Sequence, residues 1–116
     1  MSQPSPTIEI TSADASKRLE NSDTSTRPLL LDCRTPEEYA IAKIDGAVLI
    51  PMQELPARLA ELESWRDKPI VVHCHHGMRS LKVAQWLREQ GFSFAQSMTG
   101  GIDAWIAEID PAVPRY

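Results

Sequence analysis

Five short segments of the chain have the apolar or alternating pattern that predicts β-strands. Residues 29–31, 47–50 and 70–73 are almost continuously apolar, which is typical of strands buried on both faces of a parallel sheet. Residues 7–11 alternate between polar and apolar positions, and residues 94–98 form a fifth candidate. This order predicts an α/β fold with an open, five-stranded, mostly parallel sheet and helices on both faces.

The segments between these strands carry signals for helix starts. Ser12 is placed to cap the first helix. The clearest start follows the second strand, where Thr35 is expected as the N-cap, Pro36 as the first helical residue, and Glu38 as the return partner of a capping box. Further helices are expected over residues 56–62 and around Ile102, Trp105 and Ile106.

A helix predicted over residues 80–90 follows closely on the strand that ends at His73. Its buried stripe should consist of Ser80, Val83, Ala84 and Leu87. Between strand and helix lies the sequence CHHGMR, residues 74–79. Cys74 should therefore lie at the carboxyl end of a strand and face a helix N-terminus, where open α/β sheets bind their ligands.

Length and charge limit the classes of function. The 116 residues, 42% hydrophobic and 24% charged, predict a single domain over 1–116, with a core at about 8–107 and a short tail at 108–116. The net charge of −4 and the scattered Lys and Arg argue against nucleic acid or an anionic membrane as a partner. The chain shows neither signal-peptide regions nor an apolar run of membrane-spanning length, so we expect a cytoplasmic protein.

The position of Cys74 suggests a chemical role. Backbone N–H groups that converge at a strand-to-helix turn, together with the helix dipole, favour an anion such as a thiolate. Arg79 would add a positive charge at the far end of the loop. The alternative is a buried structural thiol, but the position favours a nucleophile that becomes covalently loaded. Position alone does not name the reaction.

Four segments, in order along the chain, resemble the rhodanese family. Residues 30–39, LLDCRTPEEY, resemble its LDVR…EEY signature, and residues 44–51, IDGAVLIP, resemble its IPGA…IP segment. Residues 74–79 resemble its active-site loop, and residues 100–105, GGIDAW, resemble its GG-x-x-x-W segment. Together the resemblance covers about residues 8–107.

The resemblance implies a sulfurtransferase that needs no cofactor. Cys74 would take the outer sulfur of thiosulfate or a related sulfane-sulfur donor and hold it as a persulfide. It would then pass the sulfur to cyanide, a thiol or a sulfur-carrier protein. Arg79 would orient the donor, and Asp32 and Arg34 would form a structural ion pair near the site. The remaining substrate-binding loop residues would be His75, His76, Gly77, Met78 and Ser80.

Other functions fit the sequence less well. Related phosphatases hold phosphate in a loop one residue longer than the four residues between Cys74 and Arg79, so phosphatase or arsenate reductase activity is disfavoured. A non-catalytic or regulatory rhodanese-like binding module stays open, although the presence of both Cys74 and Arg79 favours the enzyme. Residues 109–116 resemble the ends of rhodanese domains fused to activating enzymes of ubiquitin-like sulfur carriers, which points to a protein acceptor.

Two features near Cys74 invite further interpretations. His73, His75 and His76 do not predict a metal site, because adjacent strand residues point to opposite faces and no second ligand cluster accompanies them. Cys33 occupies a position where the family commonly has valine, which favours a small buried hydrophobic residue. A redox role, through a disulfide with Cys74, stays open.

Overall fold

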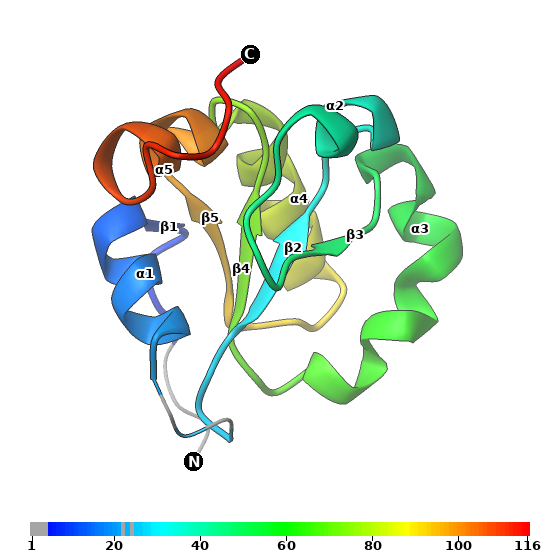
Figure 1. The fold of residues 1–116 in the computed structure, drawn as a ribbon. Helices are drawn as coiled ribbons and strands as arrows, with labels where there is room; N and C mark the ends of the chain where they lie inside the picture. The colour runs from blue at the N-terminus through cyan, green and yellow to red at the C-terminus, as the bar shows by residue number, and fades with distance from the viewer. Residues whose placement is uncertain (1–4, 22, 24) are drawn as a thin grey trace.

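The computed structural model describes residues 5–116, except residues 22 and 24, and places the strands in one sheet. The strand order is β1-β5-β4-β2-β3, and every pairing is parallel (Figure 1). The predicted five-stranded sheet is confirmed, and it is parallel throughout. The strands are β1 (Glu9–Ile10), β2 (Leu29–Asp32), β3 (Val48–Leu49), β4 (Ile70–His73) and β5 (Ala95–Met98).

Helices connect the strands and cover both faces of the sheet, as predicted (Figure 1). Between β3 and β4 the chain forms two 3-10 segments around one short α-helix rather than the single helix expected over 56–62. The α-helices are α1 (Ser12–Leu19), α2 (Pro36–Ile41), α3 (Leu55–Arg58), α4 (Met78–Glu89) and α5 (Gly101–Glu108), and the 3-10 segments are η1 (Met52–Glu54) and η2 (Leu59–Trp65).

Alternate residues of the central strands β2 and β4 build two cores. Leu31 and Val72 face a core that α4 completes with the expected stripe, whose apolar members are Val83, Ala84 and Leu87. Leu30 and Val71 face the opposite core, which α1 and α5 cover with Ala15, Ile102, Trp105 and Ile106. Burial on both faces explains why these strands are apolar at consecutive positions.

The register between β2 and β4 brings the carboxyl ends of these two strands to the same level of the sheet. Asp32 of β2 pairs with His73 of β4, and the amide of Cys33 donates to the His73 carbonyl at 3.1 Å. Cys33 and Cys74 therefore follow adjacent parallel strands at one edge of the sheet. This is the edge at which open α/β folds place their ligand sites.

The N-cap of α2 is the residue predicted from the sequence, whereas the N-cap of α1 is not. Thr35 caps α2 with the full capping box to Glu38, as predicted. The cap of α1 is Thr11 and not Ser12: Thr11 has extended backbone angles and its hydroxyl accepts the amide of Asp14 at 3.1 Å. Ser12 instead lies inside the helix and donates to the carboxylate of Glu108 on α5, so a tertiary contact uses the hydroxyl that was expected to cap.

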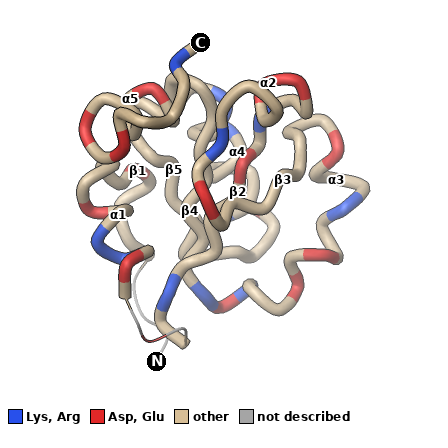
Figure 2. The backbone as a smooth tube through the Cα atoms, viewed as in Figure 1, with Lys and Arg blue, Asp and Glu red and all other residues tan. Residues whose placement is uncertain are grey.

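Charged residues of both signs are interspersed along the chain, as Figure 2 shows, and do not gather into one basic stripe. The net charge is −4. Within the described part of the chain, no helix combines the length and the apolar character needed to cross a bilayer.

Candidate active site

The sulfur of Cys74 lies under the loop that joins β4 to α4. The amide of Gly77 donates to Sγ at 3.0 Å, and the amide of Ser80 donates at 3.4 Å. The Ser80 hydroxyl lies 3.5 Å from Sγ and shares a 2.7 Å hydrogen bond with the hydroxyl of Ser97 on β5. Two amides near the N-terminus of a 12-residue helix thus donate to the sulfur, an arrangement that favours negative charge on it, and the Ser80 hydroxyl accepts from the Cys74 thiol.

The start of α5 supports the loop from behind. The amides of Ile102 and Asp103 donate to the carbonyl oxygens of Cys74 and His75, at 2.8 and 3.1 Å. Gly101 has a φ of +59°, and a Cβ built on it would lie 2.5 Å from both of these oxygens. Only glycine fits at this position, and so the GG segment of the sequence is needed for the backbone of α5 to approach the loop.

Not every loop residue in the predicted binding set contacts the sulfur. Gly77 and Ser80 do; His75 and His76 stack on one another at 3.9 Å between ring centroids, and the Met78 residue is 76% exposed. Cys74 itself is 1% exposed, in contrast to the partly exposed position typical of reactive cysteines. Nearly all of the Cys74 residue is therefore shielded from solvent.

Arg79 is held by an acidic partner that the sequence did not assign to it. Its Nη1 and Nη2 donate to the two carboxylate oxygens of Glu38, at 2.7 and 3.0 Å. Glu38 also completes the capping box of α2, so one side chain both starts a helix and fixes the loop arginine. Hydrogen bonds from Arg79, reinforced by Tyr116, hold the pKa of Glu38 well below its usual range. Both terminal nitrogens of Arg79 thus donate to Glu38.

Asp32 and Arg34 form a fully buried ion pair beside the site. Arg34 donates from Nε and Nη2 to the two carboxylate oxygens of Asp32, at 2.9 and 2.7 Å, and both residues are 0% exposed. Arg34 also donates to the carbonyl of Ala42 and to the Tyr116 hydroxyl. These bonds tie the ends of β2 and α2 together.

His73 is the exception among the buried polar residues at this edge. It is 0% exposed, and neither ring nitrogen has a hydrogen-bond partner among the described residues; Nε2 lies 3.8 Å from Asp32. Burial lowers the pKa of His73 to about 4, and the nearby Asp32 offsets this only in part. His73 is therefore neutral near pH 7, and its approach to Asp32 is not an ion pair there.

We expect His73→Leu to make the protein less sensitive to acid. The unfolded chain binds a proton at this histidine below pH 6.5, whereas the folded protein does so only near pH 4. Stability is therefore lost as pH falls through this range, by about 2 kcal/mol at pH 5. Urea unfolding at pH 7 and pH 5 should show a smaller loss for His73→Leu than for wild type. The exposed His76→Leu, as a matched control, should keep the wild-type loss; equal losses in all three proteins would contradict the prediction.

Cys33 lies close to Cys74 but in a different chemical environment. It is 1% exposed, belongs to the same core cluster, and its thiol donates to the His73 carbonyl at 3.4 Å. Burial, with the neighbouring Cys74, raises the pKa of Cys33. The thiol form is favoured, and both cysteines are free. These properties suit the small buried hydrophobic residue favoured from the sequence.

Residues far apart in the sequence complete the site. Sequence reasoning did not find the pairing of Glu38 with Arg79, the contact of Ser97 with Ser80, or the contacts of Tyr116. The signals at Glu38 were the capping box and its place in the segment that resembles the family signature, and neither of them pointed to Arg79. A hydroxyl on a buried strand was the only signal at Ser97. Across residues 5–116, with 22 and 24 set aside, no three His, Cys, Asp or Glu side chains converge to hold a metal ion.

Comparison with known proteins places this site in a family. A model of the rhodanese-like domain matches residues 11–108. A sulfurtransferase of Allochromatium vinosum is 36% identical over 97 residues, which cover 84% of this chain and 86% of that protein. The thiosulfate sulfurtransferase GlpE of Pseudoalteromonas translucida is 36% identical over 87 residues, with coverage of 75% and 81%. A rhodanese-related protein from Thermoplasma volcanium has a similar structure, with a TM-score of 0.75, 31% identity, and coverage of 98% and 100%.

Other relatives are much longer than this chain. The chain spans 30% of a rhodanese-like/PpiC domain-containing protein and 22% of the adenylyltransferase and sulfurtransferase MOCS3, both of Arabidopsis thaliana, to which it is 36% and 33% identical. The family model nevertheless matches most of the chain, and two relatives of similar length are 36% identical to it over 97 and 87 residues. The protein therefore belongs to the rhodanese-like sulfurtransferase family.

Proposed function

We propose that the protein transfers sulfane sulfur from thiosulfate to a thiophilic acceptor through a persulfide on Cys74. The observation that carries the proposal is the sulfur's environment, in which the Gly77 and Ser80 amides donate to Sγ at the N-terminus of α4. The relative named thiosulfate sulfurtransferase supports thiosulfate as the donor. Cyanide serves as a test acceptor, and a thiol or a sulfur-carrier protein is the acceptor class that we propose for the cell.

The reaction has two displacement steps. In the first, the Cys74 thiolate attacks the outer sulfur of thiosulfate; a new S–S bond forms, the S–S bond of thiosulfate breaks, and sulfite leaves with the electron pair. In the second, cyanide or a thiolate attacks the outer sulfur of the persulfide and the Cys74 thiolate leaves. No external oxidant or reductant is needed. Each step displaces one sulfur nucleophile by another nucleophile, which is covalent catalysis in two stages.

The groups around Cys74 can stabilise the anions that form in these two steps. The thiolate and the persulfide are both anions, and the loop amides at Gly77 and Ser80 are fixed donors for such an anion. Arg79 contributes positive charge at the mouth. Because Glu38 occupies its two terminal nitrogens, Arg79 acts as a fixed charge for the donor rather than as a free bidentate clamp. The burial of Cys74 suits transfer of a single sulfur atom.

Steady-state kinetics test the two-step scheme. Initial rates measured over a grid of thiosulfate and cyanide concentrations should give parallel double-reciprocal lines, because sulfite leaves before cyanide reacts. Sulfite should inhibit by reversing the first step. Lines that intersect would show that both substrates bind before any product leaves, and the persulfide scheme would then be wrong.

A further inference from the structure

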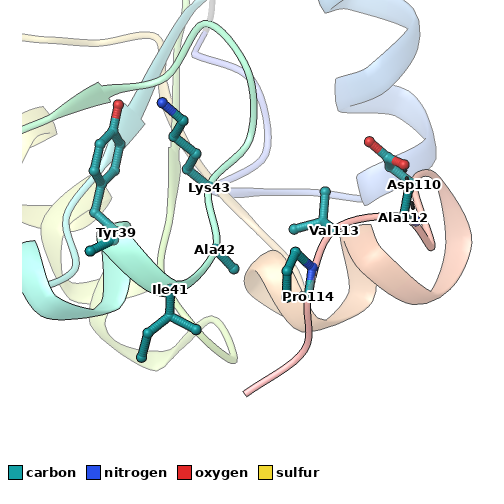
Figure 3. Close-up of a pocket in the computed structure, with 9 residues that line it drawn as sticks. Tyr39, Ile41, Ala42, Lys43, Asp110, Ala112, Val113 and Pro114 are labelled. Atoms are coloured by element: carbon teal, nitrogen blue, oxygen red, sulfur yellow. Dashed lines mark hydrogen bonds between the residues drawn. The ribbon is translucent and has the colours of Figure 1, made fainter.

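The tail that follows α5 returns to the active-site edge of the sheet. Figure 1 shows this tail leaving α5 and ending at the edge where α2 and the loop before α4 lie. Val113 and Tyr116 pack against the core on the α5 side of the sheet. Val113 and Pro114 line a hollow of about 640 Å³ together with Ile41 and Ala42. Figure 3 shows that the first two come from the tail and the other two from the end of α2 and the residue after it. The family match ends at residue 108, so residues 109–116 lie outside the matched region.

The hydroxyl of Tyr116 bridges two charged residues of the site. It donates to Oε2 of Glu38 at 2.7 Å and accepts from Nη1 of Arg34 at 2.8 Å. Arg34 is itself fixed by Asp32 in the fully buried ion pair. The hydroxyl therefore connects a rigid, buried arginine to the carboxylate that holds Arg79.

The position of Arg79 depends on that carboxylate. The Arg79 side chain is 33% exposed, and its hydrogen bonds within the described residues all go to Glu38. A long arginine side chain has many rotamers when it is not held. Glu38, held in turn by the Tyr116 hydroxyl, therefore fixes the guanidinium of Arg79 at the end of the loop that begins with Cys74.

The ring of Tyr116 makes a second contact with the loop. It stacks on His75 with 3.9 Å between centroids and 10° between planes, and His75 stacks in turn on His76. His75 directly follows Cys74. Tyr116 thus contacts the loop through its ring, which stacks on His75, and contacts Glu38, the partner of Arg79, through its hydroxyl.

We propose that Tyr116 is a positioning residue for sulfur loading, which holds Glu38 and thereby keeps Arg79 at the mouth where an anionic donor enters. This role rests on the proposed function, in which thiosulfate is the anionic sulfur donor. Tyr116 acts through Glu38 and Arg79 and does not touch the reacting sulfur. Its ring holds His75 and the start of the loop in place.

Tyr116→Phe separates the hydroxyl from the ring. The phenylalanine keeps the stacking surface and removes both hydrogen bonds, each of which involves a charged partner. We expect kcat/KM for thiosulfate to fall by about tenfold, mainly through a higher KM for this anion. Tyr39→Phe is the matched control, because it removes a tyrosine hydroxyl from α2 outside this network; it should stay within about twofold of wild type.

Alkylation of Cys74 measures the charge at the mouth without depending on sulfur transfer. In a Cys33→Val background, the rate with anionic iodoacetate is divided by the rate with neutral iodoacetamide. Tyr116→Phe should lower this ratio by about threefold or more, because a mobile Arg79 attracts the anion less. A general loosening of the loop would change both rates together and leave the ratio unaltered, and that result would overturn the proposal.

A double-mutant cycle tests the route through Glu38. In a Glu38→Gln background, Tyr116→Phe should change the alkylation ratio by less than about twofold, because its partner carboxylate is already gone. A full additional drop in that background would show that Tyr116 does not act through Glu38. If wild type takes no sulfur from thiosulfate while Tyr116→Phe still lowers the alkylation ratio as expected, thiosulfate is not the donor. In that case the positioning of Arg79 by Tyr116 is still supported.

Discussion

Replacing Cys74 by serine should abolish sulfur transfer from thiosulfate to cyanide, with a loss of at least about 1,000-fold in kcat/KM. Serine keeps a hydroxyl near the Gly77 and Ser80 amides, but an alcohol is a far weaker nucleophile than a thiol near pH 7 and forms no persulfide. The side chains are close in size, so the thermal midpoint should change little. Thiocyanate formation and circular dichroism measure the two effects.

Cys33 provides the matched control for this variant. Cys33→Val places an apolar side chain of similar size in the same core, and transfer should stay within about threefold of wild type. The opposite pattern, in which Cys33→Val removes activity and Cys74→Ser retains it, would place the sulfur on Cys33. Loss of activity in both variants, with both folded, would show that the two thiols act together.

Asp32→Ala should be the most destabilising single change at the site, with a loss of about 3–5 kcal/mol in the free energy of unfolding. Arg34 would keep its charge at 0% exposure and lose the carboxylate that accepts from its Nε, its Nη2 and its own amide. Of its partners among the described residues, only the neutral acceptors Ala42 and Tyr116 would be left to its guanidinium. A buried charge without its partner costs far more than an exposed one. Urea unfolding at pH 7 measures the loss.

An exposed ion pair serves as the comparison for Asp32→Ala. Asp103 pairs with Arg115 at 2.8 Å, with side chains 35% and 58% exposed, so Asp103→Ala should cost less than about 1 kcal/mol. If Asp32→Ala does not fold, Asp32→Ala combined with Arg34→Met should recover part of the stability, because the uncompensated charge is gone. If Asp32→Ala alone proves as stable as Asp103→Ala, the buried ion pair does not stabilise the fold as predicted.

The sequence predicted the parts of the fold that depend on local pattern. The apolar runs at β2 and β4 and the stripe Val83, Ala84 and Leu87 on α4 followed from periodicity and were confirmed. The capping box at Thr35 was also predictable, because its partners are three residues apart. The prediction that Ser12 caps α1 was wrong. The hydroxyl of Ser12 donates instead to Glu108, which is 96 residues away and could not be identified from local sequence.

The same distinction applies to the site. The strand-to-helix junction placed Cys74 beneath the loop amides, since that geometry is local. The partners of Arg79 and Arg34 were not predictable from spacing, because Glu38 lies 41 residues from Arg79 and Tyr116 lies 82 residues from Arg34. Only the fold brings the end of β2, the start of α2 and the tail to one edge of the sheet.

The burial of Cys74 was also outside the reach of sequence patterns. A loop sequence indicates which amides surround a cysteine but not how closely neighbouring segments cover it. Here α5 packs against the loop so closely that the residue at position 101 must be glycine. Cys74 is 1% exposed and belongs to the core that α4 covers, and this burial suits the transfer of a single sulfur atom that we propose.

The most direct test is the intact mass of the reduced protein after incubation with thiosulfate, measured beside Cys74→Ser and repeated after addition of cyanide. We predict that wild type alone gains one sulfur atom and that cyanide removes it as thiocyanate. A wild-type protein that gains no sulfur, or a Cys74→Ser protein that gains as much as wild type, would contradict a persulfide on Cys74.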